Sequence, residues 1–165
     1  MKIDKIVKIL KYIKPVDGRL EVIGKTKDNS IVILDYAHTP EALKTCIENV
    51  KEQFSSRKIN IVFGCGGNRD KQKRPIMGKI ANDLCNSIYL TDDNPRGENP
   101  KKIRGYIKKF ISKSKLIEIP SRKLAIRKAV LNSKSDEIVI IAGKGHEKTQ
   151  AVSYTHLRLP TIYSV

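Results

Sequence analysis

The stretch INIVFGCGGNRDKQKRP, residues 59–75, joins a nearly continuous apolar run to a glycine-rich polar loop and then to a proline that opens a helix. Equally apolar runs occur at 31–35 (IVILD) and at 137–143 (EIVIIAG). Strands that are apolar at nearly every position belong in parallel sheets, because helices cover both faces of such sheets. The sequence therefore predicts an α/β fold.

Strand-like and helix-like segments alternate on both sides of this stretch. Short β-rich runs around the turn at 27–29 predict a hairpin, and Thr39 followed by Pro40 predicts a capped helix start. The expected strands are 20–24, 30–35, 60–64, 87–91, 115–119 and 137–142, and the expected helices are 4–12, 40–53, 75–85, 100–111 and 121–132. This order predicts a Rossmann-like, doubly wound, mostly parallel sheet with helices on both faces.

The chain is strongly basic. Its 165 residues contain 33 Lys and Arg against 17 Asp and Glu, and a basic field attracts nucleic-acid phosphates regardless of sequence. The lysines are spread over nearly every expected helix, however, and the chain has no Trp and few aromatic residues, so stacking platforms are lacking. We expect one domain with no nucleic-acid partner. A basic chain also suits an anionic substrate such as a nucleotide.

The cysteines and the first residues indicate the cellular compartment. Cys46, Cys65 and Cys85 are an odd number and have no metal-ligand spacing, so we expect reduced thiols in a cytoplasmic protein and no metal site. Residues 1–18 place lysines among the apolar positions. This pattern predicts an amphipathic helix rather than a signal peptide or a membrane span.

Four of the expected strands end in unusual polar peptides: DYAHTP (35–40), GCGGNRDKQKRP (64–75), TDDNPRGENP (91–100) and AGKGHE (142–147). Ligands of open α/β sheets bind beyond the carboxyl ends of the strands, so we expect the functional site in these loops. The side chains that they offer are Asp35, His38, Arg69, Asp93, Arg96, His146 and Glu147.

Each of these loops also has a simpler interpretation. The glycines at 64–67 match neither the dinucleotide-binding nor the P-loop spacing, and they can serve a tight turn. Asp35 can cap a helix, and His146 can be an ordinary loop histidine. A solvated basic run can account for Arg69, Lys71, Lys73 and Arg74.

The block DDNPR, residues 92–96, is the least turn-like of the four. Arg96 offers a planar fork for a carboxylate, and the acids beside it attract an ammonium group. This combination predicts a pocket for a zwitterionic amino acid. Neither paired catalytic carboxylates nor a Ser/His/Asp arrangement accompanies it, so we expect no self-contained hydrolytic chemistry.

Five ordered motifs resemble the C-terminal domain of the Mur ligase family, which builds the peptidoglycan stem peptide. They are GRLEVI (18–23), DYAHTPEAL (35–43), FGCGGNRDKQKRPIMG (63–78), TDDNPR (91–96) and AGKGHE (142–147). The resemblance runs from about residue 15 to 150 and implies an ATP-dependent acid–amino-acid ligase. Members with the DNPR sequence add meso-2,6-diaminopimelate to UDP-MurNAc-L-Ala-D-Glu through an acyl phosphate, with Mg²⁺ attending the nucleotide, whereas lysine-adding relatives lack that arginine.

The resemblance also implies roles for individual residues. Arg96 and Arg69 would hold the distal carboxylate of diaminopimelate, and Glu147 would hold the distal ammonium. The implied diaminopimelate pocket consists of Arg69, Asp93, Asn94, Pro95, Arg96, Gly143 and Glu147. The implied ATP contacts are Arg19, near the phosphates, and Asp35 and His38, nearer the ribose and base.

In this family the phosphate-binding loop, the magnesium ligands and a modified lysine lie in a central ATPase domain. We therefore expect residues 1–14 to be a lead-in helix from that domain, 15–150 to be the C-terminal domain, and no catalytic residue within this chain. Residues 151–165 fit no family motif, and we expect a non-native tail. We further expect a monomer without membrane contact. A basic non-catalytic binding module and a lysine-adding or folate-ligase relative are the alternatives.

Overall fold

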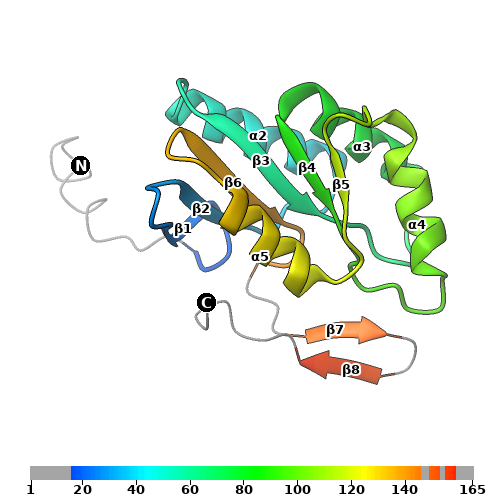
Figure 1. Ribbon diagram of the computed structural model, residues 1–165. Coiled ribbons are helices and arrows are strands. Elements are labelled where there is room, and N and C mark those ends of the chain that lie inside the picture. The colour runs from blue at the N-terminus through cyan, green and yellow to red at the C-terminus, as the bar shows by residue number, and fades with distance from the viewer. Residues whose placement is uncertain (1–15, 146–148, 153–154, 159–165) are drawn as a thin grey trace, which may run out of the picture.

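The computed structural model describes residues 16–145, 149–152 and 155–158, so the expected helix at 4–12 lies outside the described residues. A six-stranded sheet has the order β1-β2-β6-β3-β4-β5 (Figure 1). β1 is antiparallel to β2, and the other neighbouring strands are parallel. The strands are β1 (Glu21–Lys25), β2 (Ile31–Asp35), β3 (Lys58–Phe63), β4 (Ser87–Leu90), β5 (Leu116–Glu118) and β6 (Glu137–Ala142).

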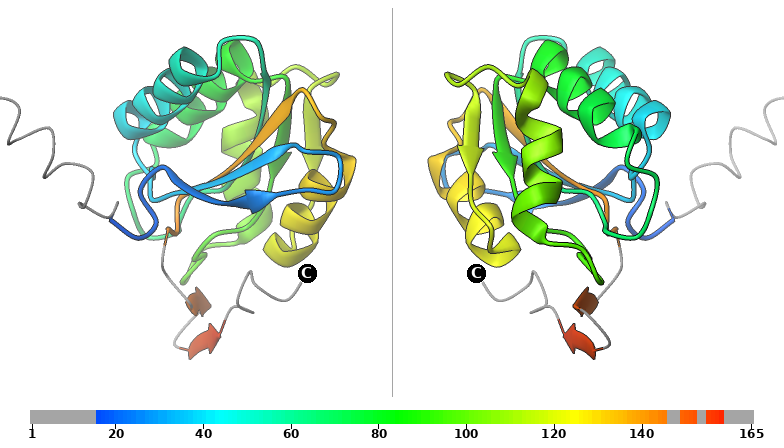
Figure 2. Two further views of the ribbon diagram at one scale, coloured as in Figure 1. Left: turned by 90° about the vertical axis from the view of Figure 1, so that its left-hand side faces the viewer. Right: turned by 90° about the vertical axis from the view of Figure 1, so that its right-hand side faces the viewer.

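Helices cover both faces of the sheet, which confirms the predicted doubly wound α/β architecture. Figure 2 shows α2 and α3 on one side of the strands and α5 on the other. The chain moves outward from β3 to β5 and then returns through α5 to place β6 between β2 and β3. The helices are α2 (Pro40–Gln53), α3 (Lys73–Leu84), α4 (Pro100–Ile107) with the 3₁₀ turn η1 (Lys108–Phe110), and α5 (Arg122–Asn132).

Side-chain caps fix where the helices begin. The Thr39 hydroxyl accepts a hydrogen bond from the Ala42 amide at 3.2 Å, and Pro40 follows it as the first helical residue. Asn99 caps α4 in the same way by accepting from the Lys101 amide at 2.9 Å. Both caps leave the preceding loop at a defined position beyond the end of a strand.

Two element boundaries differ from the prediction for identifiable reasons. α3 begins at Lys73 instead of Pro75, because proline is tolerated in the first turn, where its missing N–H has no intrahelical partner anyway. The expected helix 100–111 ends as an α-helix at Ile107 and continues as a tighter turn to Phe110.

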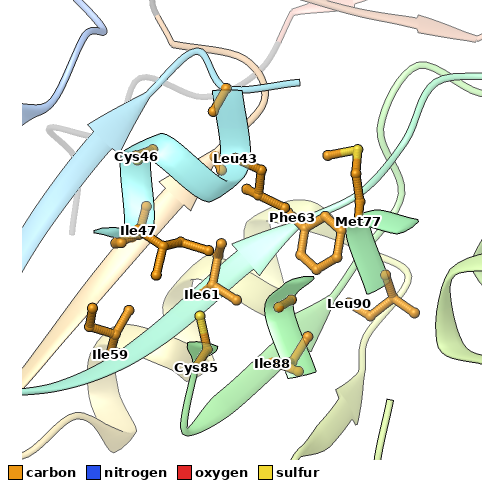
Figure 3. Packing of buried hydrophobic residues seen from close by; sticks show 14 of the residues in the cluster. Leu43, Cys46, Ile47, Ile59, Ile61, Phe63, Met77, Cys85, Ile88 and Leu90 are labelled. Atoms are coloured by element: carbon orange, nitrogen blue, oxygen red, sulfur yellow. The ribbon is translucent and has the colours of Figure 1, made fainter. Parts of the chain in front are cut away.

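The core consists of two apolar layers, one on each face of the sheet. In the larger layer, residues of β3 and β4 such as Ile61, Phe63 and Leu90 meet Leu43 of α2 and Met77 of α3 (Figure 3). The smaller layer places the central strands against the small Ala125 and Ala129 of α5. The two layers hold the strands of the sheet between the helices.

The register brings the carboxyl ends of the four inner strands to one edge of the sheet. Asp35 of β2 lies opposite Ala142 of β6, and Phe63 of β3 lies opposite Leu90 of β4. The four polar peptides singled out in the sequence follow these strands. As predicted, they emerge together.

β7 (Thr149–Val152) and β8 (Thr155–Arg158) form a separate antiparallel pair, which the sequence did not predict. The expected domain boundary at residue 150 falls within β7, and the proposed origin of residues 151–165 stays a prediction. Among the described residues, none of the helices is both long and apolar enough to span a bilayer.

We expect the native protein to be inert toward Ellman's reagent. Cys46, Cys65 and Cys85 are buried thiols, and burial raises the pKa of each, to about 12 for Cys65 and Cys85. Because the thiolate is the reactive form, the reaction should be at least about 100-fold slower than in denaturant. All three thiols should react once guanidinium unfolds the chain. Rapid reaction of the native protein would contradict this burial.

Candidate functional site

The loops after β3 and β4 lie against each other through their backbones. The Gly67 amide donates a hydrogen bond to the Asn94 carbonyl at 2.8 Å. A Cβ atom added to Gly67 would lie 1.9 Å from the Pro95 carbonyl oxygen, and one added to Gly64 would lie 2.2 Å from that of Thr91. These glycines therefore allow contact between the two loops, beyond the local turn that we considered from the sequence.

Arg96 spans the same two loops with its side chain. Its Nη1 donates to the Gly67 carbonyl at 3.0 Å and to the Asn94 carbonyl at 3.3 Å. Its φ of +50° lies in the left-handed region, where residues other than glycine are uncommon. Both hydrogen bonds use Nη1, so the guanidinium is anchored at one corner while its other nitrogens retain the geometry to grip a carboxylate.

Lys144 lies against the candidate site residues Asp93 and Asn94, although the sequence did not single it out. It is only 3% exposed, and its Nζ lies 3.4 Å from Asp93 Oδ1 and 2.8 Å from Asn94 Oδ1. Asp93 is itself buried and also accepts from the Asn94 amide. The signal was a lysine between two glycines at the end of a central strand, and it gains meaning only when β6 and β4 are known to end side by side.

Gly143 brings the end of β6 close to Asp93. Its φ is +108°, and a Cβ added there would lie 3.4 Å from Asp93 Oδ2. The Gly143 amide donates to the Asp35 carbonyl at 3.0 Å. This glycine thus links the β2 end of the edge to the β4 end.

The two aspartates of the DDNPR block point to different partners. Asp92 pairs with Arg104 of α4, which also donates to Glu118 of β5 at 2.8 Å. Lys108 completes this network, and its hydrogen bond, followed by that of Arg104, lowers the pKa of Glu118. Asp92 therefore joins α4 to the sheet, and Asp93 alone turns toward the Lys144 side.

Arg74 and Glu98 form a second pair that the sequence analysis did not assign. Arg74 is 0% exposed, and its Nη1 and Nη2 donate to the two carboxylate oxygens of Glu98, each at 2.9 Å. A solvated basic run is therefore wrong for Arg74, because α3 carries this side chain inward. It remains an adequate description of Lys71, which is exposed.

The predicted ATP residues meet at the β2 end of the edge. The Arg19 guanidinium lies over the Tyr36 ring, 4.8 Å from its centroid, and the His38 ring meets Tyr36 edge-on at 4.8 Å. Lys73 donates to the His38 carbonyl at 2.8 Å, which ties this group to the start of α3. Arg19 and His38 are exposed and thus accessible to a ligand.

Asp35 differs from these two residues because it is buried. Its Oδ2 accepts from the Leu20 amide at 2.8 Å, and its Oδ1 accepts from the Ala37 amide at 2.7 Å. It therefore fixes the backbone beside Arg19 and Tyr36. A direct contact between Asp35 and ATP stays a prediction.

The structure describes some of the remaining predicted residues and not others. Arg69 is exposed in the loop after β3, and Pro95 is buried within the DDNPR block. Glu147 and His146 lie outside the described residues. The diaminopimelate role of all these side chains stays a prediction.

Two other features do not add to this site. Within the described part of the chain, His, Cys, Asp and Glu form no group of three or more that could hold a metal ion. An open hollow of about 580 Å³, lined by residues 27–29 and 131–135, lies at the amino ends of β2 and β6. It is therefore at the edge of the sheet opposite the loops described above.

A family model, related sequences and solved structures all match this chain to the same family. Residues 18–145 match the family described as "Mur ligase, glutamate ligase domain". The UDP-N-acetylmuramoyl-L-alanyl-D-glutamate–2,6-diaminopimelate ligase of Rickettsia felis is 47% identical over 150 residues, which are 90% of this chain and 28% of that protein. The chain thus spans under a third of the length of such relatives.

Solved structures agree with this match. A UDP-N-acetylmuramoyl-L-alanyl-D-glutamate–2,6-diaminopimelate ligase superposes with a TM-score of 0.79 and 36% identity, covering 97% of this chain and 33% of that one. A bifunctional folylpolyglutamate synthase/dihydrofolate synthase from Yersinia pestis, complexed with AMPPNP and Mn ion, superposes with a TM-score of 0.60 at 20% identity, covering 78% of this chain and 28% of that one. The latter likeness shows a shared fold alone.

We expect Gly67→Ala to destabilise the protein by about 1–3 kcal/mol or more, because the new methyl group collides with backbone that cannot move alone. Gly97→Ala is the matched control, since the nearest atom to its added Cβ is the Asn68 side chain at 3.4 Å. Denaturant unfolding measures both. Equal stability of the two variants would refute the close approach of the loops.

The contribution of Glu98 to stability should depend on pH in the acidic range. Its hydrogen bonds to Arg74 lower the pKa of Glu98 to about 2, although burial acts in the opposite direction. A carboxylate with a lowered pKa stabilises the fold above its unfolded pKa, and that contribution is lost as the pH falls through the folded pKa.

The difference in unfolding free energy between wild type and Glu98→Gln should therefore be constant above about pH 5.5. Between about pH 4.5 and 2 it should shrink by about 1–2 kcal/mol, because solvent at the partly exposed Glu98 carboxylate screens the pair. Glu48→Gln, which removes an exposed pair with Lys44, is the control and should give a small, flat difference. A Glu98 difference that persists unchanged to pH 2 would contradict the pairing.

Proposed function

The chain belongs to the Mur ligase family, and we propose that it is the part of an ATP-dependent ligase that binds meso-2,6-diaminopimelate. The ligase would add this amino acid to UDP-MurNAc-L-Ala-D-Glu in peptidoglycan synthesis. The observation that carries the proposal is the meeting of Arg96, Asp93 and Asn94 at one edge of the sheet with Lys144. The name of the 47%-identical Rickettsia felis relative supports the same amino acid.

In this proposal Arg96 and Arg69 hold the carboxylate at the distal end of diaminopimelate. The anchoring of Arg96 through Nη1 to the Gly67 and Asn94 carbonyls supports it, because a preoriented guanidinium loses little freedom on binding. Glu147 holds the distal ammonium, Asp93, Asn94 and Gly143 complete the pocket, and Pro95 fixes the loop that presents Asn94 and Arg96.

The Arg19 and Tyr36 group is the proposed ATP contact of this domain. Arg19 is an exposed cation that suits a phosphate, and His38 and the buried Asp35 would lie nearer the ribose and base. Mg²⁺ neutralises phosphate charge in such reactions. As the family resemblance implies, its ligands lie mainly in the central ATPase domain.

The chain's own part in the reaction is to bind and orient the amino acid. The amine of diaminopimelate has to reach an acyl phosphate formed on the D-glutamate carboxyl, and holding the far end of the molecule limits the positions that this amine can adopt. Closure of this domain over the nucleotide brings the two together. We place the reaction in the cytoplasm, in keeping with the buried free thiols, and expect a monomer.

The test joins this chain to the remaining part of the Rickettsia felis relative and measures ATP-dependent ligation of meso-diaminopimelate and of L-lysine in parallel. Diaminopimelate should be strongly preferred. Arg96→Ala should raise the KM for diaminopimelate by about 100-fold, because a charge-assisted bidentate contact is lost. The KM for ATP should change little.

Arg57→Ala is a suitable control. Arg57 immediately precedes β3 and donates to the Asn29 and Ser135 carbonyls, at the edge of the sheet opposite the candidate site. Equal use of both amino acids, or a preference for lysine, would refute the role of Arg96. Salt-dependent DNA binding that persists in the Arg69→Ala/Arg96→Ala double variant, without any ligation, would favour a basic binding module instead.

A further inference from the structure

The loops that carry Arg69 and Arg96 are joined by an ion pair between a fully buried arginine and a partly buried glutamate. Arg74 extends from the first turn of α3, and its two terminal nitrogens bind the two oxygens of Glu98 in a fork-to-fork arrangement. Glu98 lies two residues after Arg96. The pair therefore connects α3, which is fixed in the core by Met77, to the loop after β4.

The same two side chains also hold backbone groups of the loop after β3. Arg74 Nη2 donates to the Gly66 carbonyl at 3.2 Å, and Glu98 Oε1 accepts from the Asn68 amide at 2.6 Å. The latter amide immediately precedes Arg69 in the chain. One ion pair thus fixes the backbone next to both arginines that the proposed function assigns to the carboxylate.

The backbone on both loops adopts a conformation that needs such support. Asn68 has a φ of +52° and Arg96 a φ of +50°, both in the left-handed region. Asparagine tolerates this region better than most residues, whereas an arginine persists there only when surrounding contacts determine the conformation. Asn68 is held by Glu98, and Arg96 is held by Gly67 and Asn94.

We propose that Arg74 and Glu98 are positioning residues that set the amino-acid selectivity of this site. They hold Arg96 and Arg69 at the spacing required by a second carboxylate without touching the ligand. This inference rests on the proposed function, since it assumes that the two arginines bind diaminopimelate.

The chemistry of the pair suits positioning better than simple stabilisation. Burying a charged guanidinium is costly, and apolar residues of similar volume are often as stabilising as a buried ion pair. Among the described residues, Arg74 Nε also has no hydrogen-bond partner. The pair instead orients the two loops, because its four hydrogen bonds fix the positions of Gly66, Asn68 and Glu98 relative to α3.

The test uses the same chimeric ligase with Glu98→Gln and Arg74→Lys, which keep the side-chain volume or the charge but lose the fork. Each should raise the KM for diaminopimelate by about 10-fold or more and reduce the preference over L-lysine, with the KM for ATP within about twofold of wild type. Because Arg74→Lys retains a cation, it remains informative even if Glu98→Gln fails to fold.

Glu118→Gln is the matched control. It also leaves a buried arginine, Arg104, without one carboxylate partner, but at the edge strand β5, and Arg104 keeps its pair with Asp92. It should lower the unfolding midpoint comparably and leave the KM for diaminopimelate unchanged. An equal rise in this KM in Glu118→Gln would mean that the effect is loss of stability, and it would overturn the proposal.

Amide hydrogen exchange in the 165-residue chain gives a readout independent of ligation. Glu98→Gln should speed exchange at Gly67 and Asn68 by about 10-fold or more, while the Ala125 amide at the start of α5 should be unaffected. Unchanged exchange at Gly67 and Asn68 would overturn the proposal. So would faster exchange with an unaltered KM for diaminopimelate.

The two failures are distinguishable. A wild-type chimera that ligates neither amino acid, or lysine only, refutes the proposed function and with it the selectivity role of the pair. A wild-type chimera that prefers diaminopimelate, with the same preference in both variants, refutes the positioning role alone.

Discussion

The backbone contact between the loops after β3 and β4 is the constraint on which the site depends. The Gly67 amide reaches the Asn94 carbonyl at 2.8 Å, and no side chain fits between Gly67 and Pro95. With that contact in place, the Arg96 guanidinium can donate to the Gly67 carbonyl, and the Glu98 carboxylate can accept from the Asn68 amide. The parallel register of β3 and β4 makes the approach possible, because Phe63 and Leu90 end at the same level.

Burial and partner, rather than residue type, separate the structural charges from those available to a ligand. Asp92 joins α4 to the sheet through Arg104, whereas its neighbour Asp93 faces Lys144. Arg74 is enclosed by its pair with Glu98, whereas Arg69 is exposed on the preceding loop. Charged residues close together in the sequence thus serve either the fold or the candidate site, according to their burial and their partners.

The sequence was sufficient to predict the sheet and the edge that carries the site. Apolar strands, a capping Thr39 and polar peptides at strand ends are local signals, and the structure confirms the fold that they predicted. The roles of Lys144 and Arg74 were not predictable in this way. Each depends on a partner far away in the chain, Glu98 at 24 positions from Arg74 and Asn94 at 50 positions from Lys144, and on burial that composition alone does not reveal.

The charge balance of the site gives the proposed choice of amino acid a physical basis. Of the residues assigned to the pocket, Arg69 and Arg96 are cations and Asp93 and Glu147 are acids, and Lys144, which pairs with Asp93, adds a third cation beside them. Diaminopimelate and lysine differ by one carboxylate. A site with a cationic excess favours the ligand that carries this additional carboxylate, and without it Arg96 would lack its proposed partner. The net charge of +16, which first suggested nucleic acid, is thus equally compatible with an anionic group on a small ligand.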